Sequence, residues 1–201
     1  MSRFLAVTGL IVALWCAGGS LAQEKKGPVY ATLKTSMGDI VIQLFEDKAP
    51  KTVANFIELA TGVKEWTDPK TKEKVKRPLY NRTIFHRVIP GFMIQGGDPN
   101  TKDSLKKDTY GQGGPGHTVK AEFSDIPHKR GIVSMARAAD PDTAGSQFFI
   151  VVEDSRFLDR KYSVFGEVTK GIGVADKIVN SARDERDNPK ERVEMTVTIA
   201  E

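Results

Sequence analysis

The chain has 201 residues, with 30 Lys and Arg against 26 Asp and Glu, and a formal net charge of +4. This length suits one domain with a sizeable core. Its only cysteine, Cys16, lies in an N-terminal segment that we expect to be removed. The mature protein is then without disulfides, a thiolate nucleophile or a zinc–thiolate site. Six basic and three acidic residues fall in Lys64–Arg77, and the rest of the mature chain is neutral. Nucleic-acid binders usually carry a broader basic face, so we exclude that class.

Residues 1–22 have the pattern of a secretory signal peptide. Arg3 gives a positive start, Phe4–Ala17 is an almost unbroken apolar run, and small residues precede a cleavage point after Ala22. A spanning helix needs about 20 apolar residues, so the short run argues against the alternative of an uncleaved anchor. We therefore expect a periplasmic or secreted protein that has no stable membrane span after signal cleavage.

Residues 29–201 are expected to form one domain that begins with a hairpin and a helix. Ala31 and Leu33 alternate with polar residues, and Ile40, Ile42 and Leu44 alternate with Val41 and Gln43. This pattern predicts two strands joined at Met37-Gly38. The segment Pro50–Gly62 predicts a helix, since a proline in the first turn and a final glycine enclose one apolar stripe.

The basic segment Lys64–Arg77 is a polar insertion, which we expect to form a small hairpin turned by Asp68-Pro69. A solvated surface loop is favoured over a binding element there. The rest of the chain predicts strands at Ile84–Ile89, Met93–Gly97, Gly131–Arg137, Gln147–Val152, Ser163–Val168 and Val193–Ile199, with a second helix at about Ile172–Ala182. Many short strands with two helices indicate a mainly β protein built on an antiparallel barrel.

A glycine-rich segment, Tyr110–Gly116, superficially matches a phosphate-binding loop. It lacks the Lys-Ser/Thr ending and the strand-then-helix context that such loops require. We therefore interpret it as a tight surface loop.

Strand alternation predicts two different faces on the strands near Met93 and Gln147. One face of each strand combines an amide with a large apolar group, and the other face is purely apolar. The apolar faces suit a barrel interior, and the mixed faces would then lie outside. The mixed-face residues are Met93 and Gln95 on the first strand, and Gln147 and Phe149 on the second. Burial under a loop would be an alternative explanation for their apolar members.

The segment Phe85–Asp98 holds an arginine, a histidine, two phenylalanines, a methionine and a glutamine around one Pro-Gly turn. It contains no Cys, Ser or Lys and only one carboxylate, which suits rotation about a bond better than group transfer. The segment resembles the signature of the cyclophilins, the peptidyl-prolyl cis–trans isomerases. The similarity continues in order through Gly111–Gly114, Gly131–Ala136, Gly145–Ile150, Phe157–Asp159 and Val164–Gly166, and covers about Val29 to Ile199.

The resemblance implies an eight-stranded antiparallel closed β-barrel capped by two α-helices, with isomerase activity and no cofactor or metal. It assigns Arg87 as the catalytic arginine. The substrate-binding positions that it implies are His86, Phe92, Met93, Gln95, Ala136, Gln147, Phe149, Phe157, Leu158 and Tyr162. A general-base role for His86 is disfavoured because isomerisation moves no proton.

Three departures from well-known eukaryotic members concern specificity. Phe157 replaces a tryptophan and removes an indole donor, so weak cyclosporin binding is expected. Arg137 replaces an asparagine and Tyr162 a histidine, and the pattern looks more like bacterial secreted members. We expect a monomeric isomerase that acts on proline-containing segments of exported proteins. The alternative is a cyclophilin-fold peptide-binding module or chaperone with little turnover, and a hydrolase would need a nucleophile that the sequence does not offer.

Overall fold

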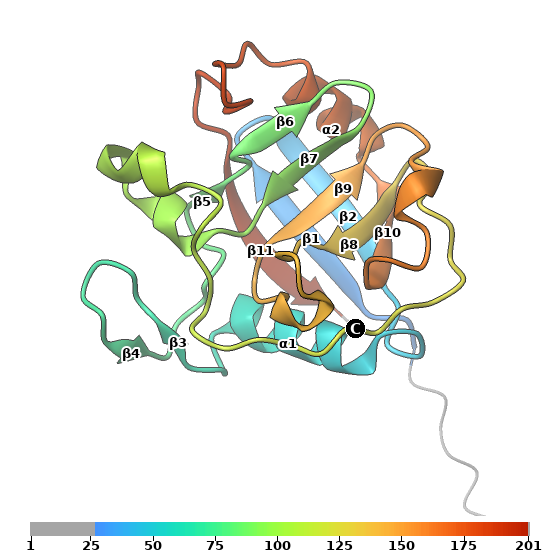
Figure 1. Ribbon diagram of the computed structural model, residues 1–201, viewed down its shortest axis with the longest axis horizontal. Coiled ribbons are helices and arrows are strands. Elements are labelled where there is room, and N and C mark those ends of the chain that lie inside the picture. Colours follow the sequence, from blue (N-terminus) through green and yellow to red (C-terminus); the bar gives the residue numbers. More distant parts are fainter. Residues whose placement is uncertain (1–26, 201) are drawn as a thin grey trace, which may run out of the picture.

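The computed structural model describes residues 27–200, and the predicted signal segment lies outside them. The described chain contains one large sheet, two helices and several short 3-10 turns (Figure 1). The strands of the sheet are β1 (Tyr30–Thr35), β2 (Gly38–Leu44), β5 (Thr83–Ile84), β6 (Arg87–Ile89), β7 (Met93–Gly96), β8 (Ile132–Met135), β9 (Phe148–Val151), β10 (Val164–Lys170) and β11 (Glu194–Ala200). The helices are α1 (Pro50–Thr61) and α2 (Ile172–Val179), and the 3-10 turns are η1 (Pro99–Lys102), η2 (Ser104–Thr109), η3 (Pro141–Thr143) and η4 (Arg156–Leu158). Neither helix in this part of the chain is long and apolar enough to cross a membrane.

The sheet closes on itself through the short segment between β5 and β6. The strand order is β5-β11-β1-β2-β10-β8-β9-β7-β6, with every pairing antiparallel. Between the two end strands, the Phe85 N–H donates to the Val193 carbonyl at 3.1 Å and the His86 N–H donates to the Gln95 carbonyl at 3.0 Å. The end strands are therefore one kinked strand, which the sequence predicts as Ile84–Ile89. With these two counted as one, the barrel has eight strands, and the mainly β antiparallel fold is confirmed.

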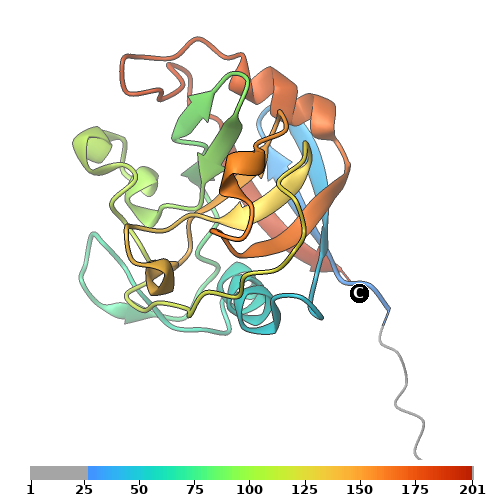
Figure 2. The same cartoon turned by 45° about the vertical axis from the view of Figure 1, so that its right-hand side comes forward.

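The interior of the barrel is filled by apolar side chains and closed at its two ends by the helices. Figures 1 and 2 show α1 and α2 at opposite ends. Helix α1 buries Val53, Phe56 and Leu59 and ends at Gly62, which has the left-handed φ of 79° that glycine adopts without strain. The Phe56 ring lies 4.9 Å from Tyr80 and 5.7 Å from Phe148. Such aromatic pairs add about 0.5–1.5 kcal/mol each beyond their area burial.

The basic insertion forms the predicted hairpin, with β3 (Trp66–Thr67) paired to β4 (Lys74–Val75). The Asp68 carboxylate turns it by accepting the Lys70 N–H at 2.8 Å and by pairing with Arg77. Its base is anchored rather than solvated, because Trp66 is buried and donates its indole N–H to the Arg77 carbonyl at 2.7 Å. The expectation of a simple solvated loop was therefore wrong at this residue.

Candidate active site

The two faces of β7 and β9 divide as strand alternation predicts. The inward side chains, Ile94, Phe148 and Ile150, belong to the main core of the barrel. The outward apolar side chains, Met93 and Phe149, form a separate cluster on the outside of the barrel with Leu158, Val164 and others. Because Met93 and Phe149 are only 2% and 4% exposed, this outer cluster is a packed surface rather than scattered exposed residues.

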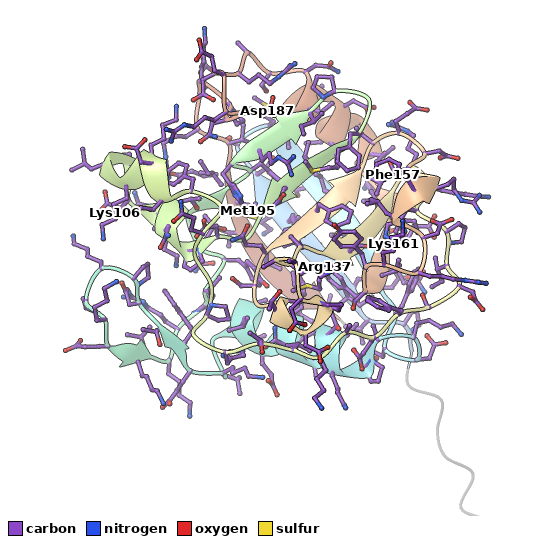
Figure 3. All side chains as sticks on the ribbon, viewed as in Figure 1. Lys106, Arg137, Phe157, Lys161, Asp187 and Met195 are labelled. Carbon is purple, nitrogen blue, oxygen red and sulfur yellow. The ribbon has the colours of Figure 1, made fainter. Side chains whose placement is uncertain are left out.

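A cavity of about 330 Å³ opens over the outer cluster. Figure 3 shows two of its lining residues, Phe157 and Arg137, on one face of the molecule. Nine of the eleven positions implied by the resemblance line this cavity. They are Arg87, Phe92, Met93, Gln95, Ala136, Phe149, Phe157, Leu158 and Tyr162, and the tenth lining residue is Arg137.

Aromatic rings form the walls of this cavity. The Phe92 and Phe157 rings lie 5.4 Å apart on one side, with Phe157 supplied by η4. The Phe149 and Tyr162 rings meet edge to face at 5.6 Å, and the Arg137 guanidinium lies 4.6 Å above the Tyr162 ring. The cavity therefore offers flat apolar surfaces to a small ring, and one cation–π contact fixes Tyr162.

Arg87 stands at the polar rim of this cavity. It faces Gln95 across the β6–β7 pairing, and its Nη1 donates to Gln95 Oε1 at a long 3.4 Å. The side chain is exposed and has no other hydrogen-bond partner among the described residues. A guanidinium with most of its donors free therefore stands next to an apolar pocket.

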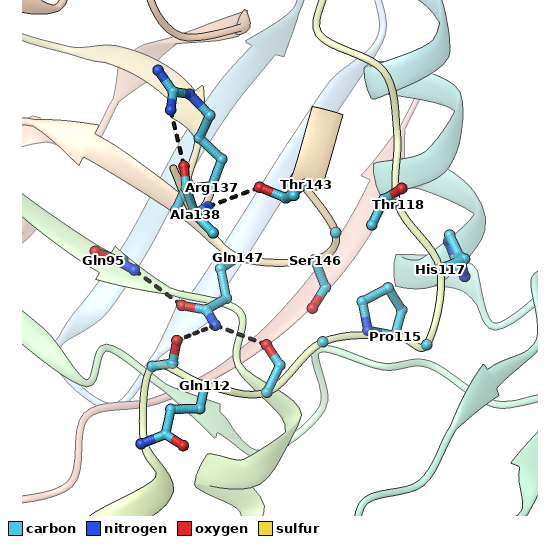
Figure 4. A pocket seen from close by; sticks show the side chains of 16 residues that line it. Gln95, Gln112, Pro115, His117, Thr118, Arg137, Ala138, Thr143, Ser146 and Gln147 are labelled. Atoms are coloured by element: carbon cyan, nitrogen blue, oxygen red, sulfur yellow. Dashed lines mark hydrogen bonds between the residues drawn. The ribbon is translucent and has the colours of Figure 1, made fainter. Parts of the chain in front are cut away.

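A chain of amide hydrogen bonds continues from Gln95, the partner of Arg87, to the glycine-rich loop, and Figure 4 shows it from Gln95 onward. Gln95 Nε2 donates to Gln147 Oε1 at 3.0 Å, and Gln147 Nε2 donates to the carbonyls of Gly111 and Gly113 at 2.9 and 2.8 Å. Gln147 does not line the cavity beside Arg87. It lies in a neighbouring cavity of about 530 Å³ between the glycine-rich loop and residues 136–147. The interpretation of that loop as plain surface was therefore incomplete, since it forms a wall of this second cavity.

The glycine-rich loop is held in place by a residue that sequence reasoning missed. The Asp98 carboxylate is fully buried and accepts the backbone N–H groups of Gly111 at 2.6 Å, Gly113 at 3.3 Å and Asn100 at 2.7 Å. Burial raises its pKa, and the three hydrogen bonds oppose that rise. The available signal was that Asp98 is the only carboxylate in Phe85–Asp98.

His86 is buried beside the glycine-rich loop rather than in the cavity beside Arg87. It is 2% exposed, does not line the cavity beside Arg87, and sits next to Gly111 on the border of a smaller polar cavity. Burial lowers its pKa to about 4, so the ring is neutral at pH 7.

A second buried histidine supports the pocket from below. His128 Nε2 lies 2.9 Å from Ser134 Oγ, and its Nδ1 lies 3.3 Å from Asp159 Oδ1. This order of groups is that of a hydrolytic triad, but Ser134 and His128 are both fully buried, so no substrate can reach the hydroxyl. The His128 ring stacks on Phe149 at 6.2 Å, which gives the cluster a packing role.

The comparisons with known proteins agree with this geometry. The family model for the cyclophilin-type peptidyl-prolyl cis-trans isomerases matches residues 30–199. The chain belongs to the cyclophilin family. This cyclophilin is 44% identical over 177 residues to peptidyl-prolyl cis-trans isomerase B of Streptomyces anulatus, covering 86% of this chain and 97% of that protein.

Two further relatives extend the agreement. The cyclophilin is 43% identical to a probable peptidyl-prolyl cis-trans isomerase A of Mycobacterium leprae, over 85% of this chain and 91% of the relative. A crystal structure of a Cryptosporidium parvum cyclophilin, determined in the presence of the dipeptide Ala-Pro, matches with a TM-score of 0.70 and 30% identity, over 86% of this chain and 99% of that one. The cyclophilin is thus a peptidyl-prolyl cis–trans isomerase.

Proposed function

We propose that this cyclophilin isomerises X–Pro bonds in exported proteins, with Arg87 as its catalytic residue. The observation that carries the assignment of the site is the pairing of a largely free guanidinium with an aromatic-walled cavity of about 330 Å³. Such a pair can hold a proline ring and at the same time present donors to the bond that rotates.

The chemistry of the bond explains why an arginine is suited to this role. Amide resonance gives the X–Pro bond a rotational barrier of about 18–20 kcal/mol. Twisting the bond leaves a lone pair on the prolyl nitrogen, and a donated N–H stabilises that twisted state more than the planar one. The guanidinium of Arg87 is permanently charged and rigid, so it needs no proton transfer to act.

Arg87 cannot supply the whole effect alone. A 10⁵-fold acceleration would require about 7 kcal/mol of transition-state stabilisation. Removing one hydrogen-bond donor from a preorganised site typically costs about 2.7–4 kcal/mol. The remainder falls to the aromatic walls, which hold the proline ring while the preceding residue turns. The residues that we assign to this clamp are Phe92, Met93, Phe149 and Leu158.

The direct test is exchange NMR on a short proline peptide with wild type and Arg87→Ala. We expect Arg87→Ala to lose turnover far more than peptide affinity. Equal losses in both would mean that Arg87 mainly binds substrate, and no rate above the spontaneous one in wild type would favour the alternative of a peptide-binding module.

Export is the less direct part of the proposal, and its support is the signal-peptide pattern of residues 1–22. Cell fractionation with N-terminal sequencing tests it. We expect a periplasmic or secreted protein that starts at Gln23, and a full-length cytoplasmic protein would overturn the proposal. Size-exclusion chromatography with light scattering tests the expected monomer.

We expect weak cyclosporin binding because of Phe157, which lines the cavity beside Arg87. Phe157 is 63% exposed there and offers no indole donor to a ligand. Phe157→Trp is expected to tighten cyclosporin binding, measured by calorimetry, and unchanged affinity would remove this explanation.

A further inference from the structure

We call the cavity of about 330 Å³ beside Arg87 the proline pocket. A third cavity, which is polar and of about 270 Å³, also borders Arg87 and Gln95. We name it the basic cavity, because three cationic residues line it: Arg87, Lys107 and Arg186. Since it shares Arg87 and Gln95 with the proline pocket, a polypeptide bound at Arg87 would reach it within a few residues. Its volume is that of roughly nine water molecules at about 30 Å³ each, enough for one side chain with its solvent.

Two elements that are distant in sequence build the basic cavity. Lys107 Nζ of η2 pairs with Asp184 Oδ2 at 2.7 Å, and Arg186 Nη1 pairs with Asp108 Oδ1 at 2.9 Å. The two pairs cross between η2 and the loop that follows α2. The loop is also bonded to β6, since the Val88 N–H donates to the Asp187 carbonyl at 2.9 Å. The loop wall of the cavity is therefore bonded to the catalytic strand, and the η2 wall is bonded to the loop.

The carboxylates of Asp108 and Asp184 pair with the cationic side chains but stay outside the lining of the basic cavity. Neither Asp108 nor Asp184 lines it, so its lining carries only positive charge. The Arg186–Asp108 pair is 67% and 92% exposed at its side chains, which makes it a weak solvent-screened pair. Arg186 can therefore exchange Asp108 for an incoming anion at little cost.

We propose that the basic cavity binds an acidic side chain of the client polypeptide a few residues from the proline. This selectivity would make the enzyme prefer proline segments with a nearby Asp or Glu over those with Lys. The inference rests on the proposed role of Arg87, because it assumes that the X–Pro bond lies between the two cavities.

The test is a set of Ala-Pro peptides assayed by exchange NMR, which avoids the sequence preference of a coupling protease. Glu, Gln or Lys is placed in turn at each of the three positions before and after Ala-Pro. We expect kcat/KM at one position or two adjacent positions to follow the order Glu, Gln, Lys, with steps of about two- to fivefold. The preference is expected to shrink as salt is raised from about 0.01 to 1 M, because the Debye length falls from about 30 to 3 Å.

Matched variants separate the cavity from overall charge. Arg186→Glu is expected to abolish or reverse the Glu preference. Its control is Arg183→Glu, which makes the same charge change on the same loop at a residue that pairs with Asp187 and does not line the cavity. Equal effects of the two variants would overturn the proposal.

A second pair of variants predicts a change in the opposite direction. Asp108→Asn removes the competing carboxylate and is expected to strengthen the Glu preference about twofold or more. Asp125→Asn is its control, since Asp125 is 86% exposed, pairs with Arg160 at 2.8 Å and does not line the cavity.

The outcomes also separate this proposal from the proposed function. A wild type with strong turnover but equal rates on Glu and Lys peptides would overturn only the selectivity. A wild type without turnover on any peptide would overturn the proposed function itself. If Arg87→Ala kept full turnover, the catalytic role of Arg87 would fail while the charge preference could still be read from Arg186→Glu.

Discussion

The two faces of the β7–β9 pair do different work with nearly the same residue types. Ile94 and Phe148 point into the barrel and are fully buried among apolar side chains. Met93 and Phe149, their immediate neighbours in sequence, point outward and line the proline pocket. The inner face needs only to fill volume, whereas the outer face must keep a cavity open and hold an arginine beside it. Packing and chemistry are therefore separated by one residue of strand register.

The largest expected effect comes from a substitution on the inner face, and it tests whether the two faces are independent. Phe148→Ala is expected to lower the free energy of unfolding by about 3–5 kcal/mol, because it removes a fully buried ring from a cluster with Phe56 and Tyr80. Chemical denaturation measures the loss. The kcat/KM of the folded fraction should stay that of wild type, and a large loss of turnover per folded molecule would show that the faces are not independent.

The converse substitution, at Arg87 on the outer face, is expected to lower turnover without changing the free energy of unfolding. Arg87→Ala is expected to lower kcat/KM by about 10²- to 10³-fold, the usual cost of losing one preorganised hydrogen-bond donor. The free energy of unfolding should change by no more than about 0.5 kcal/mol, since the side chain is exposed. Arg87→Lys keeps the positive charge but loses the rigid planar set of N–H donors. Full activity in that variant would contradict the role given to the guanidinium geometry.

A pH titration sharpens the comparison at His86, which lies buried beside Gly111 and belongs to neither face. Its folded-state pKa of about 4 lies below the ordinary 6.5, so the unfolded chain binds more protons between those values. The contribution of His86 to the free energy of unfolding is fully present above about pH 6.5. It decreases by on the order of 3 kcal/mol as the pH drops toward 4.

Thermal denaturation of wild type and His86→Gln from pH 4 to 8 measures this contribution. The variant should lose less stability on acidification than wild type. Turnover per folded molecule should stay flat over the range, because the reaction moves no proton. Parallel stability curves for the two proteins would assign the acid sensitivity to other groups.

The smallest expected effect concerns the amide chain that links the catalytic strand to the glycine-rich loop. Gln147→Ala removes the two hydrogen bonds to Gly111 and Gly113 and the one from Gln95. Only the bond from Gln95 reaches the catalytic strand, and its loss, at about 0.5–1.5 kcal/mol, should lower kcat/KM by up to about tenfold. Amide hydrogen exchange in the loop should quicken, and unchanged exchange would mean that Asp98 alone holds the loop.

Much of the outer face could be predicted from alternation alone. The period of two placed Met93 and Gln95 on one side and Ile94 on the other, and the structure confirms that division. Alternation does not extend to Phe157 and Leu158, because they come from a 3-10 turn outside the sheet. Their placement depended on the resemblance to a family.

The contacts between loops could not be predicted. The Asp98 carboxylate meets the Gly111 N–H 13 residues away, and Arg186 meets Asp108 across 78 residues. No periodicity in the sequence encodes such a meeting, since it depends on how the barrel brings its connections together. The same reason explains Trp66, whose burial depends on Arg77 and Lys102 folding over it.

The pairing of β1 with β11 has a consequence for the timing of folding. The first and last strands of the barrel are hydrogen-bonded neighbours along their whole length, from Tyr30 opposite Ala200 to Thr35 opposite Met195. Contacts between residues so far apart in sequence close late and slow the folding reaction. Until β11 pairs with β1, the strands that bind proline belong to an open sheet, and the barrel closes only when these two strands meet.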